Sequence, residues 1–252
     1  MRKARLLASS VVLVLTLAAC GSSDDSSDSD TIMVFAAASL KKTFTEIGEQ
    51  FETDNPGVSV EFNFAGSSDL VTQLTQGAQA DVFASADTGN MDKATAADLL
   101  DDKPVNFASN TLTIAVAPGN PKQITSFLDL AKPGLNVVVC APPVPCGSAT
   151  QKVEEATGLN LAPVSEESSV SDVLNKVTTG EADAGLVYVT DAMGAGDKVT
   201  AVAVPEAAGA VNTYPIAALK TAKNPELARR FIAAVTGDAG QKTLTAAGFA
   251  KP

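Results

Sequence analysis

From residue 31 onward, segments in which apolar residues are spaced as in strands alternate with segments in which they are spaced as in helices. Short runs of apolar and β-branched residues predict strands, and most are followed by stretches with apolar residues at helical spacing. The predicted strands are 32–36, 58–65, 82–84, 112–116, 136–140, 184–189, 199–204 and 213–218, and the predicted helices are 40–53, 68–76, 91–97, 126–132, 148–157, 170–179, 225–235 and about 239–247. This alternation predicts an α/β fold with mainly parallel sheets.

The first 30 residues have a different pattern. Three basic residues precede an apolar run at 6–19 that is short for a membrane span, and Leu17-Ala18-Ala19-Cys20-Gly21 resembles the lipobox of bacterial lipoproteins. We therefore expect 1–19 to be a signal peptide and Cys20 to be lipidated; the alternative is an ordinary secretory signal with an incidental Cys20. Gly, Ser and Asp alone make up 21–30, so we expect 20–30 to be a disordered tether.

Charge and composition exclude several functions. The chain has 18 basic and 29 acidic residues, and removal of the leader with its three basic residues changes the net charge from −11 to −14. So acidic a chain, without a basic cluster, is not expected to bind nucleic acid. Histidine is absent, which removes the commonest general base and metal ligand, so we expect no cofactor and no metal cation held by protein ligands.

Cys140 and Cys146 are the cysteines besides Cys20. In an exported protein, so close a pair favours a disulfide over a redox site, and without a further Cys or His it lacks the ligands for zinc. We expect a Cys140–Cys146 disulfide.

Small polar residues mark the start of four predicted helices. They are Ser39, Ser67-Ser68, Cys146-Gly147-Ser148 and Ser168-Ser169-Val170. A helix start offers unpaired backbone N–H groups and partial positive charge, which suit an anion, provided that the sheets bring these starts together. The alternative is that Ser39, Ser67, Ser148 and Ser169 simply cap their own helices.

Three other candidates have ordinary alternatives. Tyr188 ends a predicted strand, where its hydroxyl could donate to an anion or simply point into water. Ser39 and Lys42 match the S-x-x-K pattern of serine enzymes, but the companion S-D-N and K-T-G motifs are missing. Asp81 and Asp87 form a possible carboxylate pair, for which a helix cap and a strand-end hydrogen bond are the favoured roles.

Six segments together resemble the molybdate-binding proteins of ABC transporters. They are 34–40, 64–68, 80–87, 144–147, 184–188 and 214–217, in order along residues 31–252. The resemblance implies a type II periplasmic-binding-protein fold, in which two α/β lobes are joined by two crossing strands near 110–112 and 213–215. Lobe one would be 31–109 plus 214–252, and lobe two 110–213.

The resemblance also implies a set of ligand-binding residues. Ser39 and Ser67 would donate hydroxyl and backbone N–H groups, Cys146 and Val170 would donate backbone N–H groups, and Tyr188 would donate its hydroxyl. This chain departs from the family by having Cys146 at a Pro-Ala-Gly-like helix start and Gly66 where some relatives have serine.

The implied function is binding of molybdate, and of tungstate, without catalysis. The protein would act as a lipid-anchored monomer on the extracytoplasmic face of the cell membrane and deliver the anion to an ABC permease. Alternatives are a carrier of another tetrahedral oxyanion such as sulfate, a phosphate binder that uses Asp69 as acceptor, and a secreted serine enzyme that uses Ser39 and Lys42.

Overall fold

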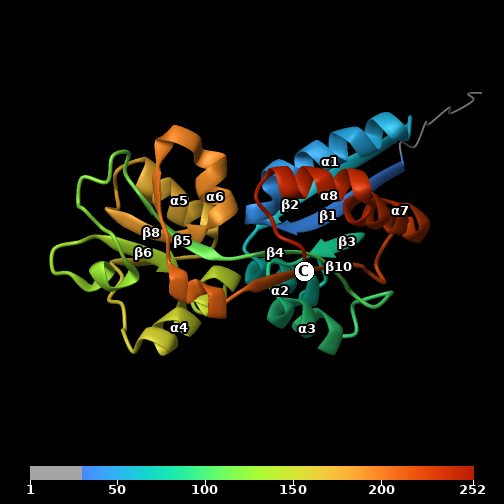
Figure 1. Cartoon of the computed structure of the whole chain (residues 1–252). Helices are drawn as coiled ribbons and strands as arrows, with labels where there is room; N and C mark the ends of the chain where they lie inside the picture. Colours follow the sequence, from blue (N-terminus) through green and yellow to red (C-terminus); the bar gives the residue numbers. More distant parts are fainter. Residues whose placement is uncertain (1–29) are drawn as a thin grey trace, which may run out of the picture.

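The computed structural model describes residues 30–252, which form two lobes lying side by side (Figure 1). Each lobe has a five-stranded sheet covered by helices on both faces, so the predicted two-lobed α/β architecture is confirmed. The leader at 1–19, the lipidation site Cys20 and all but the last residue of the tether lie outside the described residues. Within residues 30–252, no helix combines the length and the apolarity needed to cross a bilayer.

The sheet of lobe one has the strand order β2-β1-β3-β10-β4, in which β10 is antiparallel to both of its neighbours. Helices α1, α7 and α8 lie on one side of this sheet, and α2 and α3 on the other (Figure 1). The elements are β1 (Asp30–Ala37), α1 (Lys41–Asp54), β2 (Val58–Ala65), α2 (Ser67–Thr75), β3 (Val82–Ala84), α3 (Thr88–Ala96), β4 (Val105–Asn110), β10 (Asn212–Ala218), α7 (Pro225–Thr236) and α8 (Asp238–Ala246).

An aromatic cluster anchors α1 in lobe one. Phe44, Ile47 and Phe51 recur at helical spacing and are at most 5% exposed. Phe231 of α7 meets Phe44 and Phe51 edge-on, with ring centroids 6.1 and 5.5 Å apart. This packing fixes the start of α1, which follows the carboxyl end of β1.

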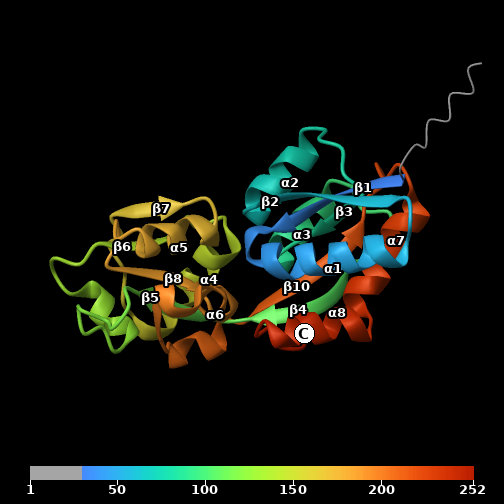
Figure 2. The ribbon, with the colours of Figure 1, turned by 90° about the horizontal axis from the view of Figure 1, so that it is seen from above.

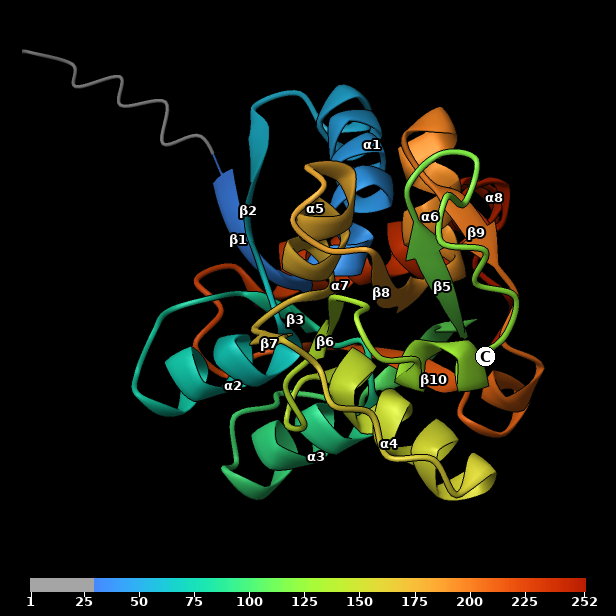
Figure 3. The ribbon, with the colours of Figure 1, turned by 90° about the vertical axis from the view of Figure 1, so that its left-hand side faces the viewer.

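The sheet of lobe two has the strand order β7-β6-β8-β5-β9, in which β5 is antiparallel to both of its neighbours. Because β5 and β10 each run against two neighbours, half of the strand pairs are antiparallel, and the prediction of mainly parallel sheets is wrong. Its helices α5 and α6 lie on one side and α4 on the other, as Figure 3 shows from the end of the molecule. The elements are β5 (Leu112–Val116), β6 (Val137–Cys140), α4 (Pro145–Thr157), β7 (Ser165–Glu167), α5 (Val170–Thr178), β8 (Ala184–Tyr188), α6 (Val189–Ala195) and β9 (Thr200–Val202). Short 3-10 helices span Ala38–Leu40, Phe127–Ala131, Gly196–Lys198 and Pro205–Gly209.

Two adjacent segments connect the lobes. Thr111 alone separates β4 from β5, and residues 203–211 lead from β9 back to β10 (Figure 2). Asn110 and Asn212 are paired in register where β4 meets β10. The Asn110 side-chain amide also donates to the hydroxyl of Thr190 at 2.8 Å, which ties the connection to α6.

Three of the strands and α-helices were not predicted from the sequence. β4 contains Asn106, Ser109 and Asn110, and Ser109 is nevertheless buried because its hydroxyl donates to the Lys251 carbonyl at 2.6 Å. β7 is a three-residue, polar edge strand, and α6 is a seven-residue helix for which the sequence analysis gave no prediction. The predicted helix at 126–132 is a 3-10 helix.

Asp81 and Asp87 have structural roles, as favoured from the sequence. The Asp81 carboxylate accepts the Met33 and Lys223 N–H groups at 2.7 and 2.6 Å, which ties β1 to the segment after β10. Asp87 caps α3 by accepting the Asn90 N–H at 2.8 Å.

Candidate functional site

A small cavity lies between the lobes, at the carboxyl ends of β1, β2, β6 and β8. Its volume is about 10 Å³, enough for about one water-sized group, so it has no room for an extended organic substrate. The five residues predicted to bind the ligand all line it, although their role as ligands stays a prediction. The lining residues are Ala37, Ala38, Ser39, Gly66, Ser67 and Ala86 from lobe one, and Val144, Pro145, Cys146, Val170 and Tyr188 from lobe two.

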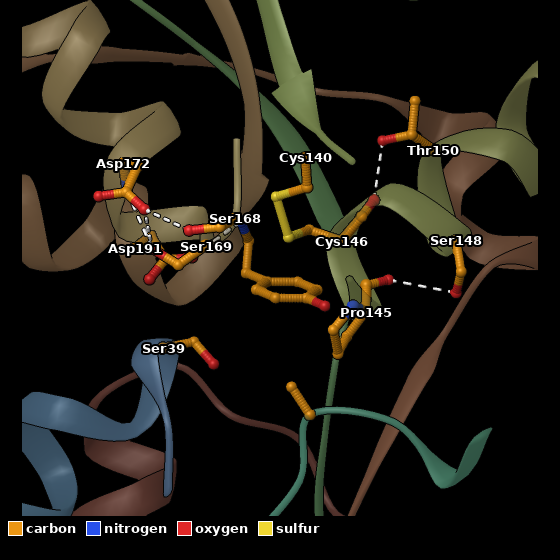
Figure 4. Close-up of a disulfide and its surroundings, with 12 residues drawn as sticks. Ser39, Cys140, Pro145, Cys146, Ser148, Thr150, Ser168, Ser169, Asp172 and Asp191 are labelled. Atoms are coloured by element: carbon orange, nitrogen blue, oxygen red, sulfur yellow. Dashed lines mark hydrogen bonds between the residues drawn. A yellow bond between two sulfur atoms is a disulfide. The ribbon is translucent and has the colours of Figure 1, made fainter. Parts of the chain in front are cut away.

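Ser39 follows β1 and lies inside the 3-10 helix Ala38–Leu40. It does not cap this helix, because Ala37 occupies the N-cap position and no side chain caps it. The Ser39 hydroxyl instead lies 3.1 Å from the hydroxyl of Tyr214 on β10. The capping alternative for Ser39 is therefore wrong, and its side chain faces the cleft, across from Pro145 and Cys146 (Figure 4).

Ser67 is the first residue of α2 and is 1% exposed. Gly66 occupies the N-cap position, so Ser67 does not cap its helix either. Its hydroxyl oxygen accepts the Ala86 N–H at 3.0 Å, which leaves the hydroxyl proton free to donate into the cavity.

Two helix starts of lobe two direct backbone N–H groups toward the same space. In α4 the first helical hydrogen bond joins the Ser148 N–H to the Val144 carbonyl. The N–H groups of Cys146 and Gly147 come before this bond and therefore have no partner within the helix. In α5 the first helical hydrogen bonds run from the N–H groups of Asp172 and Val173 to the Ser169 carbonyl, so the Val170 N–H has no partner within the helix.

Of the two remaining capping predictions, one is confirmed and the other is wrong. Ser169 caps α5 by accepting the Asp172 N–H at 3.3 Å, as predicted. Ser148 is not a cap, because α4 begins three residues earlier than predicted, at Pro145; the Ser148 hydroxyl donates back to the Pro145 carbonyl (Figure 4).

Tyr188 supplies a buried polar group without a partner. The residue is 1% exposed, and its hydroxyl is one of the buried side-chain atoms among the described residues that have no hydrogen-bond partner. Burial, with the nearby Tyr214 and Asp87, raises the pKa of Tyr188 well above its ordinary value of 10. The hydroxyl therefore keeps its proton and is available to donate to an acceptor in the cavity.

The side chains and helix starts around the cavity form a donor set. No Lys, Arg, Asp or Glu is among the lining residues, and residues 30–252 contain no cluster of His, Cys, Asp and Glu that could hold a metal ion. Asp69 is exposed and does not line the cavity, so no carboxylate is placed to accept the proton of a phosphate. The arrangement favours a small anion that carries no proton.

The alternative of a serine enzyme finds no support in the arrangement of Ser39 and Lys42. Lys42 is exposed and does not line the cavity, and the hydrogen-bond partner of Ser39 is Tyr214. A base within reach of the nucleophile is required for such chemistry.

The lobes are closed over the cavity. The Asn212 side-chain amide donates to Ala86 of lobe one at 2.8 Å and to Pro145 of lobe two at 3.3 Å, and Asn90 donates to Pro143 across the cleft at 3.3 Å. Gly66 lies directly against the Ser168 carbonyl of the opposite lobe. No local sequence pattern indicates a role for Tyr214, Asn212 or Ala86, because their positions depend on the pairing of β10 and the placement of the lobes.

The predicted disulfide joins Cys140 at the end of β6 to Cys146 in the first turn of α4, beside the cavity (Figure 4). The intervening loop is tight: a Cβ on Gly147 would overlap the Ala141 carbonyl. We expect a protein that begins at residue 30 to show no free thiol when it is unfolded without reductant, and two after reduction, in a titration with a thiol-reactive dye. Two thiols without reductant would contradict the bridge.

Comparison with known proteins places the chain in a family. Residues 32–250 match the bacterial extracellular solute-binding proteins, and the chain belongs to this family, whose members bind solutes rather than act as enzymes. The molybdate-binding protein ModA of Mycobacterium tuberculosis (strain H37Rv) is 61% identical over 250 residues, 96% of each chain.

Two solved structures show the same fold. The periplasmic molybdate-binding protein of Azotobacter vinelandii has a TM-score of 0.76 at 21% identity, covering 88% of this chain and 99% of its own. The sulfate-binding protein SubI of Mycobacterium tuberculosis has a TM-score of 0.75 at 21% identity, covering 87% and 86%. At these identities the similarity establishes the fold, and the ligand has to be inferred from the residues that line the cavity.

Proposed function

We propose that this protein binds molybdate, and also tungstate, in the cavity between its lobes and delivers the anion to an ABC permease. The observation that carries the proposal is a cavity between the lobes whose lining has no charged side chain and whose polar side-chain groups are the hydroxyls of Ser39, Ser67 and Tyr188, the last one buried and unpartnered. The 61% identity to a molybdate-binding protein supports the same ligand.

Molybdate suits this donor set chemically. At neutral pH it is a dianion with four acceptor oxygens and no proton, so it can accept from each hydroxyl and free backbone N–H group of the cavity. Each helix start contributes the equivalent of roughly half a positive charge at short range. The charge of the remaining acidic surface is screened beyond about 8 Å at physiological salt, so it does not prevent binding.

Closure of the lobes connects binding to transport. Ser39 and Ser67 lie on lobe one, whereas Cys146, Val170 and Tyr188 lie on lobe two, so the donor set is complete only when the lobes meet. An anion that is held by both lobes shifts the population toward the closed form, which is the form that a permease would recognise.

The lipidated Cys20 is proposed as the membrane anchor. A tether of about ten residues would span at most ~36 Å when extended, which keeps the domain near a membrane-bound permease. We propose that the protein acts there as a monomer on the extracytoplasmic side.

Calorimetric titration tests the ligand. We expect tight binding of molybdate and tungstate and much weaker binding of sulfate and phosphate. Molybdate at a hundredfold excess over its Kd should add about 2.7 kcal/mol to the free energy of unfolding, and thus raise the Tm by several degrees. Sulfate is the second candidate because it is also an unprotonated tetrahedral acceptor; a preference for sulfate or phosphate over molybdate would overturn the proposed ligand.

A further inference from the structure

The geometry points to an electrostatic guide at the mouth of the cavity: Lys41, Lys42 and Lys198 attract the anion into the cleft and raise its association rate. This inference rests on the proposed function, since it concerns the same anion. It adds a route of entry and assigns a role to three residues that do not line the cavity.

The three lysines line one groove that lies between the lobes. Lys41 and Lys42 come from the first turn of α1 in lobe one, and Lys198 from lobe two. The groove encloses about 590 Å³ and shares Ala38 and Ser39 with the anion cavity, so it leads directly to the cavity wall.

Lys41 also lines a second, smaller groove of about 230 Å³. This groove shares Ala38 and Gly66 with the cavity and includes Ser168 and Ser169 on the other side of the cleft. Lys41 therefore lies beside both openings, two residues after Ser39.

The ammonium groups of these lysines are free to act on a passing ion. All three residues are exposed, and none has an ion-pair or hydrogen-bond partner for its side chain within residues 30–252. Some other basic residues are paired instead: Lys122 with Asp183, Lys176 with Glu167, and Arg229 with Asp101 and Asp102.

The acidic groups nearest the openings are partly compensated. Asp191 lines the larger groove; its carboxylate accepts the Tyr188 N–H at 3.0 Å, and burial raises its pKa to about 7, so part of the population is neutral at neutral pH. Asp172 lines the smaller groove and accepts from the Ser169 hydroxyl at 2.7 Å. Positive charge therefore predominates in the larger groove, on a strongly acidic chain.

This local field matters because the rest of the molecule repels a dianion. A cleft lined by charge of the opposite sign raises association rates by about 10- to 1,000-fold in favourable cases, and the effect falls steeply with ionic strength. Since the lysines lie outside the cavity, they should affect how fast the anion arrives and leave its dissociation rate unchanged.

The chain itself supplies the signal for the test. It has no tryptophan and two tyrosines, Tyr188 and Tyr214, both buried beside the cavity with ring centroids 6.0 Å apart. Stopped-flow tyrosine fluorescence with molybdate therefore reports on the site. We compare the wild type, the double variant Lys41→Gln/Lys42→Gln, the single variant Lys198→Gln, and a control of equal charge, Lys103→Gln/Lys242→Gln, whose exposed lysines line neither groove.

At about 20 mM salt we expect the association rate of the Lys41/Lys42 variant to fall about tenfold, and that of Lys198→Gln by a smaller factor, with dissociation rates within twofold of wild type. At about 0.5 M salt these differences should disappear. Equal association rates and salt slopes in the groove variant and the control would overturn the guide, as would a change confined to dissociation. Failure of the proposed function is distinguishable, because the wild type would then not bind molybdate at any salt concentration.

Discussion

Replacement of Gly66 by alanine should abolish tight anion binding while leaving both lobes folded. An added Cβ would overlap the Ser168 carbonyl oxygen of the opposite lobe, which cannot move without shifting the capped start of α5. The backbone at Gly66 has φ −60° and ψ 140°, which alanine adopts without strain. Alanine therefore acts only on the contact between the lobes and should leave the free energy of unfolding within about 1 kcal/mol of wild type.

The expected loss of affinity is at least about 100-fold. Charge-assisted hydrogen bonds contribute about 1.5–3 kcal/mol each, and lobes held apart would lose several of them at once. Calorimetry gives the affinity, and small-angle scattering with molybdate shows whether the variant fails to close. Gly89→Ala in α3 is the matched control, since the nearest atom to its new Cβ, apart from chain neighbours, is 3.9 Å away. Normal affinity in Gly66→Ala would mean that the bound form is less closed than this structure.

Gly66 also shows what the sequence could not reveal. In the sequence it was only a departure from relatives that have a serine at this position. The structure shows that it lies against the Ser168 carbonyl of the other lobe. Contacts between lobes depend on how two separately folded units meet, and no local pattern in either segment encodes that distance.

The donor set was easier to predict from the sequence, because helix starts are local features. Small polar residues at the end of an apolar strand predicted the positions of Ser39 and Ser67, and the resemblance to a family indicated which starts belong together. The sequence could not decide whether each serine caps its helix. The outcome depends on one residue of register: Ser67 is the first helical residue and leaves its hydroxyl to the cavity, whereas Ser169 precedes its helix and caps it.

The prediction of secondary structure failed where polar residues are buried and hydrogen-bonded to partners far away along the chain. β4 was missed because Ser109 and Asn110 interrupt its apolar pattern, and their partners are Lys251 and Thr190, more than 75 positions away along the chain. The amphipathic helices α1 and α7 were predicted because the spacing of their own apolar residues carries the signal.

Tyr188→Phe should weaken molybdate binding while the protein without ligand becomes no less stable. In the structure the Tyr188 hydroxyl is buried and unpartnered, so its removal takes away a desolvated polar group that contributes no internal hydrogen bond. Denaturant unfolding without ligand should therefore give an equal or higher free energy of unfolding. With ligand, loss of one charge-assisted hydrogen bond, about 1.5–3 kcal/mol, should weaken the affinity by about 10- to 100-fold.

Tyr214→Phe is the matched control, because it removes a hydroxyl from the other tyrosine of the same aromatic pair. The Tyr214 hydroxyl has a protein partner, the Ser39 hydroxyl at 3.1 Å, so its loss should reduce stability by about 0.5–1.5 kcal/mol and affect binding only through the position of Ser39. The two variants should thus show opposite patterns in unfolding and in calorimetry. If Tyr188→Phe lowers stability and leaves molybdate affinity unchanged, the Tyr188 hydroxyl has an internal partner in solution, and it is not a ligand donor. The opposite pattern assigns the hydroxyl to the anion, because a donor buried without a partner within its own chain gains its hydrogen bond only from what the cavity holds.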